Sequence, residues 1–427
     1  MNMKALIPVY LLLSSAAHGQ CMYEYQVISA PPPCPTSPVI MQDLNHHGVA
    51  VGYFYLCAGA ARSFRWTAET GMQLLDVGPQ LDSFATDVND AGQIAGTVLP
   101  LGNATNTAFR WSPPIDEKSD PEGVMELLLE PPVVPGGLPH LDAFTFGNGI
   151  GPTGEVFGEF GDGSSTPWPF RWTPGSPASC YCEIVEGMQR GGVIASSETG
   201  FVTGTVYEVG TWTEHAHLTH TPSGTISILP TIPGGTSSTA WAVSSNGFVT
   251  GWGMWVDPRR GAYPAAYVRA FFWNGATMTL MPPNDLAQGT ENPGHMGHGV
   301  NALGQVVGTM TKAAKAFLWH DGQMFILRSL VAGIGTNDIK DAQGINDRGQ
   351  IVCRIQIGTK GYGALLTPIR TRPGDATIDC KVNEKDIFAI FEFWHNEYAY
   401  PDGPGDLTGD RFVDGADLAM VLGDWGE

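Results

Sequence analysis

The stretch Asn89–Gly96 reads Asn-Asp-Ala-Gly-Gln-Ile-Ala-Gly: a polar residue, a glycine, a short apolar run and a second glycine. Related stretches return six times, at Asn45–Gly52, Gly151–Gly158, Ser197–Gly204, Ser244–Gly251, Asn301–Gly308 and Asn346–Cys353. Their first glycines stand at positions 48, 92, 154, 200, 247, 304 and 349, which gives a period of about 45 residues with two longer insertions. A repeat of this length indicates units that stack or are arranged around an axis.

A second motif follows each turn and contains two aromatic residues separated by one position. It is Phe-x-Trp in five copies, at Phe64–Trp66, Phe109–Trp111, Phe170–Trp172, Phe271–Trp273 and Phe317–Trp319, and it is degenerate in copies four and seven. A turn glycine with a positive φ angle joins two strands in a hairpin, and the apolar alternation around it predicts those strands. Each copy therefore predicts four short strands, named A to D in chain order, with the aromatic pairs packed between repeats.

These units predict an all-β fold, a seven-bladed β-propeller of four-stranded blades over residues 22–370. Copy seven lacks a strand D, and residues 23–28 form an unassigned alternating segment before copy one. We expect this N-terminal strand to complete the last blade and close the ring. An open solenoid of the same repeats is the alternative.

Composition narrows the class of protein further. The 427 residues include 55 Gly and 32 Pro, which disfavour helix interiors. The formal net charge is −20, so the chain offers no basic face to neutralise nucleic-acid phosphates. Because 43% of the residues are hydrophobic, a large core is expected rather than a disordered polyelectrolyte.

Residues 1–19 have the pattern of a secretory signal peptide, with Lys4, an apolar run to Leu13 and small residues after it. No later apolar stretch is long enough to span a membrane. We expect an extracellular or cell-surface protein, with the periplasm as an alternative. Lipid attachment at Cys21 is a further alternative, which Gln20 disfavours. Export permits disulfides among the seven cysteines, and their spacing leaves the pairing open.

The motif Ala-Phe-x-Trp, together with Asn-Asp-x-Gly-Gln-Ile/Val-x-Gly, resembles the HAF-type extracellular repeat of bacterial proteins. The resemblance covers about residues 39–370. It implies a repeat architecture and export. It implies no enzymatic activity, because the family is defined by its repeat.

The tail, residues 371–427, differs in composition, with thirteen acidic and three basic side chains from position 373 onward. Two aligned 12-residue loops, 375–386 and 406–417, carry oxygen side chains at positions 1, 3, 5, 9 and 12, and position 7 would offer a main-chain carbonyl. Ca²⁺ takes six to eight oxygen ligands, so two calcium sites are predicted. Their residues are Asp375, Thr377, Asp379, Lys381, Asn383 and Asp386, and Asp406, Thr408, Asp410, Phe412, Asp414 and Asp417.

An apolar helical pattern follows each loop, and the duplicated loop–helix resembles a type I dockerin. The resemblance implies a small α-helical, EF-hand-like module that binds a cohesin-like protein in the presence of Ca²⁺. Position 6 is Cys380 or Arg411 rather than glycine, and position 3 is threonine, so weakened calcium binding is expected. A solvated acidic tail without metal is the alternative.

An enzyme on a propeller usually gathers acids or histidines around the axial channel, which strand A lines. The residues expected there are Asp43, Asp87, Phe146, Ala195, Ala242, Gly299 and Gly344. Acids occur in two adjacent blades only, and we expect Asp43 and Asp87 to cap turns rather than to form a glycosidase pair. The sequence contains no GxSxG or HExxH motif. Catalysis is therefore undecided but disfavoured, and a channel lined by Gly, Ala and Phe would exclude it.

The best ligand candidate is the loop between strands B and C of blade five. Aromatic and arginine side chains on an exposed loop suit stacking on sugars or holding a peptide. The residues are Trp252, Trp255, Arg259, Arg260, Tyr263 and Tyr267, with Trp168 of blade three as a further candidate. A loop packed on its own blade is the simpler alternative.

The sequence thus favours a secreted, non-catalytic binding or structural protein with a docking tail. A carbohydrate-active enzyme that takes part in polysaccharide degradation is the alternative, because dockerins often accompany such enzymes.

Overall fold

The computed structural model describes residues 21–426 except 58, 76–80, 101–104, 115–122, 131, 133–143, 162–166, 181–187, 257–265, 283–293 and 399–402. The chain forms two compact units. One comprises residues 24–367, and the other comprises residues 368–427 with the N-terminal residues up to Tyr23. Residues 1–19, which the sequence predicts to be a signal peptide, lie outside the described residues.

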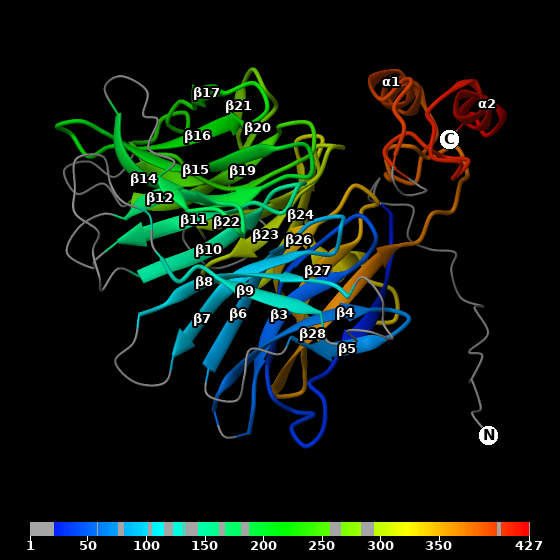
Figure 1. Ribbon diagram of the computed structural model, residues 1–427. Coiled ribbons are helices and arrows are strands. Elements are labelled where there is room, and N and C mark those ends of the chain that lie inside the picture. Colours follow the sequence, from blue (N-terminus) through cyan, green and yellow to red (C-terminus); the bar gives the residue numbers. More distant parts are fainter. Residues whose placement is uncertain are drawn as a thin grey trace. The chain divides into compact units, whose positions relative to one another are not determined.

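The larger unit is a β-propeller of seven four-stranded antiparallel sheets, as predicted (Figure 1). Blade one has β2 (Val39–Leu44), β3 (Ala50–Tyr55), β4 (Ala61–Thr67) and β5 (Gly71–Leu74). Blade two has β6 (Leu81–Val88), β7 (Ile94–Pro100), β8 (Thr107–Ser112) and β9 (Val124–Leu127). Blade three has β10 (Phe144–Ile150), β11 (Val156–Gly161), β12 (Trp168–Trp172) and β13 (Ser179–Cys180). Blade four has β14 (Met188–Ser196), β15 (Phe201–Glu208), β16 (Glu214–His220) and β17 (Thr225–Ile228).

The remaining blades repeat this order. Blade five has β18 (Thr239–Val243), β19 (Val249–Val256), β20 (Ala266–Trp273) and β21 (Met278–Leu280). Blade six has β22 (His295–Val300), β23 (Val306–Met310), β24 (Lys315–His320) and β25 (Gln323–Ile326), followed by the 3₁₀ helix η2 (Leu327–Leu330). Blade seven has β26 (Asp338–Ile345), β27 (Ile351–Ile357), β28 (Lys360–Pro368) and the N-terminal strand β1 (Tyr23–Ile28).

The ring is closed, which excludes the open solenoid. Strand β1 pairs with β28 and supplies the outer strand of blade seven, as the sequence predicts. The innermost strand of each blade contacts that of the next, and β2 of blade one contacts β26 and β27 of blade seven.

The turn glycines adopt the conformation that the hairpin requires. All seven have φ between +71° and +86°, a region in which residues with a Cβ atom are strained. The predicted packing of the aromatic pairs is also confirmed. The five Phe side chains of the Phe-x-Trp motif have exposures of 0%, and four of their Trp partners, Trp66, Trp111, Trp172 and Trp319, are buried with exposures of 4–5%.

The second position of the motif requires glycine for a different reason. In all seven blades the innermost strand carries a β-bulge opposite the start of the second strand. A Cβ atom on Gly52 would lie 2.0 Å from the Ile40 carbonyl oxygen, and one on Gly158 would lie 1.8 Å from that of Phe146. The glycine therefore makes room for a main chain that the bulge pushes toward it.

Side-chain to main-chain hydrogen bonds join neighbouring turns around the ring. Asn45 Nδ2 donates to the Asn89 carbonyl, and Asn89 Nδ2 donates to that of Gly151, each at 2.9 Å. Asn301 Nδ2 donates to Asn346, and Asn346 Nδ2 donates to Asn45 across the closure between blades seven and one. Other polar side chains serve the remaining junctions: Asn148 to Val193, Thr199 to Ser245 and Asn246 to Ala302.

The smaller unit contains two short helices, α1 (Glu384–Glu392) and α2 (Gly415–Gly423), which contact each other. A disulfide joins Cys21 to Cys380 in this unit, and another joins Cys34 to Cys57 in the propeller. Cys353 is buried and free. Among the described residues, neither α-helix has the length and hydropathy of a membrane span.

Replacing Asn346 with alanine should destabilise the propeller, because the buried Asn45 carbonyl loses its donor at the closure. We expect a loss of about 1–3 kcal/mol in the free energy of unfolding, measured by denaturant titration. Asn274→Ala is the control, since this exposed asparagine caps only a turn within blade five. Equal effects of the two substitutions would contradict a special role for the closure bond.

Candidate functional site

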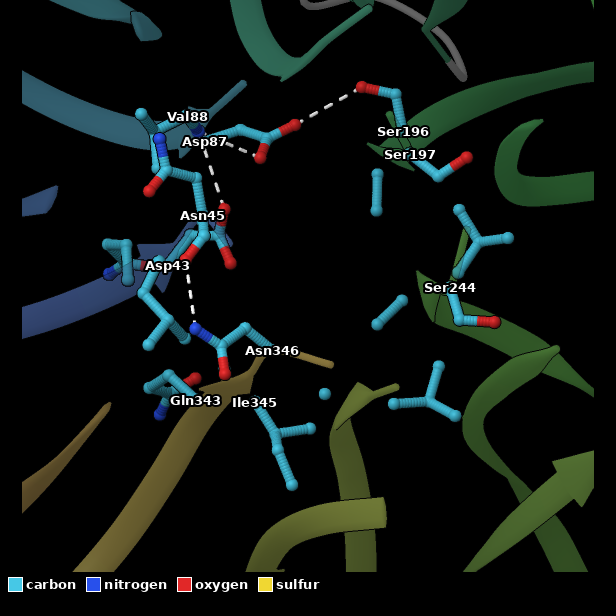
Figure 2. Close-up of a pocket in the computed structure, with 18 of the residues that line it drawn as sticks. Asp43, Asn45, Asp87, Val88, Ser196, Ser197, Ser244, Gln343, Ile345 and Asn346 are labelled. Carbon is cyan, nitrogen blue, oxygen red and sulfur yellow. Dashed lines mark hydrogen bonds between the residues drawn. The ribbon is translucent and has the colours of Figure 1, made fainter. Parts of the chain in front are cut away.

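A cavity of about 420 Å³ lies on the propeller axis, within the size range of pockets that hold small ligands. Its walls come from the innermost strands and first turns of all seven blades. Figure 2 shows residues of blades one, two, four, five and seven arranged around this central space. We call it the axial pocket.

The bulges aim one residue of each blade at the axial pocket. The residue left unpaired by each bulge lines the cavity in all seven cases. These residues are Gln42, Thr86, Asn148, Ile194, Trp241, His298 and Gln343. A bulge re-aims a side chain that regular pairing would turn elsewhere, so this ring follows directly from the repeat.

The prediction of the channel residues is largely confirmed. Six of the seven line the pocket: Asp43, Asp87, Ala195, Ala242, Gly299 and Gly344. The expectation for Phe146 is wrong, because it lies too early on β10 and packs against Phe144 at 5.1 Å between ring centroids. Its blade lines the pocket with Asn148 and Ile150 instead. The wall is thus more polar than the Gly, Ala and Phe lining that would have excluded an enzyme.

Asp43 and Asp87 form a hydrogen-bonded carboxyl pair between blades one and two. Burial raises the pKa of both groups. Asp87 accepts hydrogen bonds from the Val88 and Ile150 main chain and from Ser196 Oγ, at 2.8–3.1 Å, which favours its ionised form. The pair therefore binds its first proton at a higher pH than two separate aspartates would, and Asp43 is the more strongly shifted of the two groups. Direct contact leaves no room for the sugar that a glycosidase places between its two carboxyl groups.

His46 bridges three blades at the turn end of the pocket. Its Nδ1 lies 3.0 Å from Asp90 of blade two, and its Nε2 lies 2.9 Å from Asp347 of blade seven. Burial alone would lower the pKa of His46, but the Asp347 and Asp90 carboxylates raise it well above its ordinary value. The imidazolium therefore links the blades on either side of blade one. Burial acts to raise the pKa of Asp347, but His46 holds it below its ordinary value.

Glu198 stands beside this bridge, and burial, together with Asp90, raises the pKa of its carboxyl group well above the ordinary value.

An aromatic cluster forms the wall between blades five and six. Trp241 lines the pocket and is 38% exposed. Its ring centroid lies 4.7 Å from that of Trp252 and 6.1 Å from that of His298. Trp252 is among the ligand candidates from the sequence, whereas Trp241 and His298 are not. The detectable signal for both was their position three residues before the polar start of the turn motif.

The other described ligand candidates, Trp255, Tyr267 and Trp168, do not join this cluster. Trp255 packs in the core between blades and lies under the Arg269 guanidinium, 5.4 Å from its ring centroid. Tyr267 is half-buried beside Trp255, at 6.4 Å, and Trp168 packs on the core of blade three. Arg259, Arg260 and Tyr263 lie outside the described residues.

The two loops of the tail unit share an internal hydrogen-bond pattern. In each loop the position-6 main-chain N–H donates to the position-1 aspartate, from Cys380 to Asp375 and from Arg411 to Asp406. The position-12 aspartates, Asp386 and Asp417, accept from positions 3 and 9. These four aspartates have exposures of 0%. Each loop therefore buries two carboxyl groups, one from either end.

The remaining predicted ligands differ between the loops. Asp379 and Thr377 are buried in the first loop, whereas Thr408, Asp410, Phe412 and Asp414 are exposed in the second. Asn383 and Asp414 cap the two helices, each within a capping box. Lys381 is exposed, and its main-chain N–H donates to Asp379.

The donor set of these loops fits a hard cation. Burial raises the pKa of Asp375 to about 7, and Asp379 and Asp386 add to the shift. A divalent cation would relieve this crowding of like charges, and Ca²⁺ prefers carboxylate and carbonyl oxygens. Position 6 is left-handed in both loops, at φ +63° for Cys380 and +78° for Arg411, where glycine would be less strained.

Cys21 and Cys380 lie close to Asp375, within 4.8 Å between ligand-type atoms. Their sulfur atoms are joined in a disulfide, so they do not offer the thiolates that a soft-metal site needs.

No protein-family model matches this sequence, and no curated protein does. Among solved structures, a gluconolactonase from Xanthomonas campestris matches with 11% identity and a TM-score of 0.33, over 67% of this chain and 90% of that one. AofleA from Arthrobotrys oligospora matches with 10% identity and 0.37, over 71% and 90%. The sialidase of Trypanosoma rangeli matches with 10% identity and 0.39, over 93% and 62%. The fold assignment rests on the strand pairing described above, and these values transfer no activity.

The carboxyl pair predicts a pH dependence of stability. Because the folded state binds more protons than the unfolded chain, stability falls as pH rises from the ordinary aspartate pKa, about 4, through the raised value. Asp43→Asn keeps the hydrogen bond to Asp87 without an ionisable group. We therefore expect a smaller decline in unfolding free energy as the pH rises above about 4.

The exposed Glu69, on the turn between β4 and β5, provides the matched control Glu69→Gln. It should decline with pH as the wild type does. An Asp43→Asn profile parallel to that of the wild type would contradict the raised pKa values of this pair.

Proposed function

We propose that this chain is an exported, non-catalytic binding protein. Its propeller, of the HAF-repeat type, presents a recognition site for a carbohydrate or peptide, and its C-terminal module is a dockerin-like unit that binds two Ca²⁺ ions and docks to a cohesin-like partner. The observation that carries the proposal is the duplicated loop, in which equivalent aspartates accept equivalent main-chain hydrogen bonds.

The residues that would hold the ions are the two sets named above. Asp375 and Asp386, or Asp406 and Asp417, would provide the buried carboxylates, and Cys380 and Arg411 at position 6 would weaken binding relative to glycine. When bound, Ca²⁺ supplies positive charge that allows these carboxyl groups to stay ionised in a buried loop. Such binding would stabilise the module, because the unfolded chain has no preformed site.

A docking role is supported by apolar side chains that the tail unit leaves exposed. Ile390 and Val421 are buried, but Phe388 is 66% and Phe391 is 55% exposed on α1. Leu422 at 56%, Trp425 at 48% and Phe412 at 47% are exposed near α2. Exposed aromatic side chains in such a small unit suit a protein interface, where aromatic residues are enriched.

Export is supported by disulfides such as Cys21–Cys380 and Cys34–Cys57, since disulfides persist in oxidising compartments such as the extracellular space or the periplasm. The signal-peptide pattern of residues 1–19 agrees with this location.

One observation favours the second candidate function, a carbohydrate-active enzyme. Glu159 lines the axial pocket, and burial raises the pKa of its carboxyl group, as expected of a general acid. An enzyme of this kind would release reducing sugar from a polysaccharide, and Glu159→Gln would abolish the release. The leading proposal expects no product from either form.

The docking proposal is tested with the mature chain by calorimetric Ca²⁺ titration and by pull-down with a panel of cohesin domains. We expect two bound ions, with one lost in Asp375→Ala and one lost in Asp406→Ala. Glu392→Ala, at an acid of α1 outside the loops, should keep both. Capture should need Ca²⁺ and should disappear with chelator, and capture that is indifferent to Ca²⁺ would contradict the proposal.

The disulfide at loop position 6 predicts a difference between the two sites. Cys380 has a left-handed main-chain conformation and forms a disulfide with Cys21. The double substitution Cys21→Ser and Cys380→Ser should therefore remove a covalent restraint on the conformation of the first loop. We expect weaker Ca²⁺ binding at one of the two sites, measured by calorimetry. The double substitution Cys34→Ser and Cys57→Ser removes the propeller disulfide and should leave both sites unchanged. Two unaltered sites in the first variant would refute the coupling.

A further inference from the structure

We propose that the axial pocket binds a neutral saccharide, with one face of a sugar ring packed on Trp241 and its hydroxyl groups held by the ring of bulge residues. This inference rests on the proposed binding role of the propeller and assigns that role a place and a ligand class.

The first argument is the exposed indole. Trp241 lies at a bulge near the axis, and its ring contacts Trp252 of blade five and His298 of blade six. Figure 2 shows the open space that its blade shares with the others. An aromatic side chain that stays exposed at the centre of a propeller lacks the stabilisation that burial would give it. A ligand bound in the pocket would bury this indole surface. The C–H groups on one face of a pyranose suit the electron-rich face of an indole.

The second argument is the set of polar atoms left open around the pocket. Asn148 Nδ2 donates to the Val193 carbonyl at 2.8 Å, which leaves its Oδ1 as an acceptor. His298 Nδ1 lies 3.2 Å from the Ala342 carbonyl, so the ring carries its hydrogen there and presents Nε2 as an acceptor. Burial lowers the pKa of His298, which keeps the ring neutral.

Two further amides complete this set. Gln343 Nε2 lies 3.5 Å from Asp341 Oδ1, which leaves its Oε1 open, and the Gln42 amide has no partner among the described residues. Acceptors arranged around a cavity favour a ligand with several donors on its edge, which describes a sugar.

The charge of the pocket selects against ionic ligands. Its described wall contains no Lys or Arg, and the His46 imidazolium is paired with Asp90 and Asp347, so phosphates, sialic acids and uronates would find no free counter-charge. The carboxyl groups do not favour a cation. Asp43 and Asp87 form a carboxyl pair with raised pKa values, Asp347 is paired with His46, and burial raises the pKa of Glu159 and Glu198, which favours their neutral forms. The open polar atoms belong mainly to neutral groups, which matches a neutral ligand.

The test uses the mature chain and a panel of neutral sugars: glucose, galactose, mannose, xylose, cellobiose, lactose, mannobiose and xylobiose. Binding is detected by saturation-transfer NMR and quantified by calorimetry, with glucosamine, glucuronate and a peptide array as comparison ligands. We expect at least one neutral sugar to bind, and Trp241→Ala to weaken it about tenfold or more.

The matched control is Trp212→Ala. Trp212 is 55% exposed and is not part of the pocket wall, so this variant should bind as the wild type does. Gln42→Ala provides a second variant at a side chain without internal hydrogen bonds, and it should weaken binding several-fold. Thermal unfolding of each variant separates loss of binding from loss of fold.

Three outcomes would overturn the inference. They are binding of none of the neutral sugars, binding of charged sugars or peptides alone, and neutral-sugar binding that Trp241→Ala and Gln42→Ala leave unchanged. In the second and third outcomes the propeller still binds a ligand, so the proposed function survives. If no ligand of any class binds, the recognition role of the propeller fails as well.

Discussion

A side-chain hydrogen bond from one turn to the main chain of the next is the interaction on which the ring depends. Blades are built alike but are far apart in sequence, and each needs a fixed rotation relative to its neighbour. The donors Asn45, Asn89 and Asn301 give this rotation between consecutive blades, and Asn346 gives it across 301 residues at the closure. These amides are buried, so an unpaired one would be costly, which makes the closed ring the arrangement that satisfies them all.

The same turns determine the axial pocket. The first glycine turns the chain, and the second allows the bulge to press the innermost strand against its partner. The bulge then rotates one side chain per blade toward the axis. The identity of that side chain differs from blade to blade, and three of the seven, Thr86, Asn148 and His298, also hydrogen-bond to the main chain of the next blade. A regular frame thus carries seven variable positions, as a recognition site requires.

The sequence predicts the frame well because its physical requirements are local. A turn glycine, a Phe-x-Trp strand and the alternation of Tyr23–Ile28 each indicate their structure without knowledge of distant residues. The residues that line the pocket are harder to predict from the sequence. Trp241 lies at a bulge on the innermost strand and not on the aromatic loop beyond Trp252, and in blade three the bulge residue that lines the pocket is Asn148, two positions after Phe146. A bulge also shifts the strand register by one residue, which simple alternation does not anticipate.

The two units differ in how they stabilise their buried carboxylates. In the propeller, Asp87 accepts hydrogen bonds from Ser196 and from main-chain N–H groups, and Asp347 is paired with the His46 imidazolium, so the chain itself stabilises both carboxylates. In the tail, aspartates enter each loop from both ends and are buried with main-chain N–H groups as donors. Hydrogen bonds of that kind stabilise one carboxylate but do not cancel the repulsion between several. The propeller acids are therefore stabilised within the chain, whereas the crowding of the tail acids supports the proposal that the two loops bind Ca²⁺.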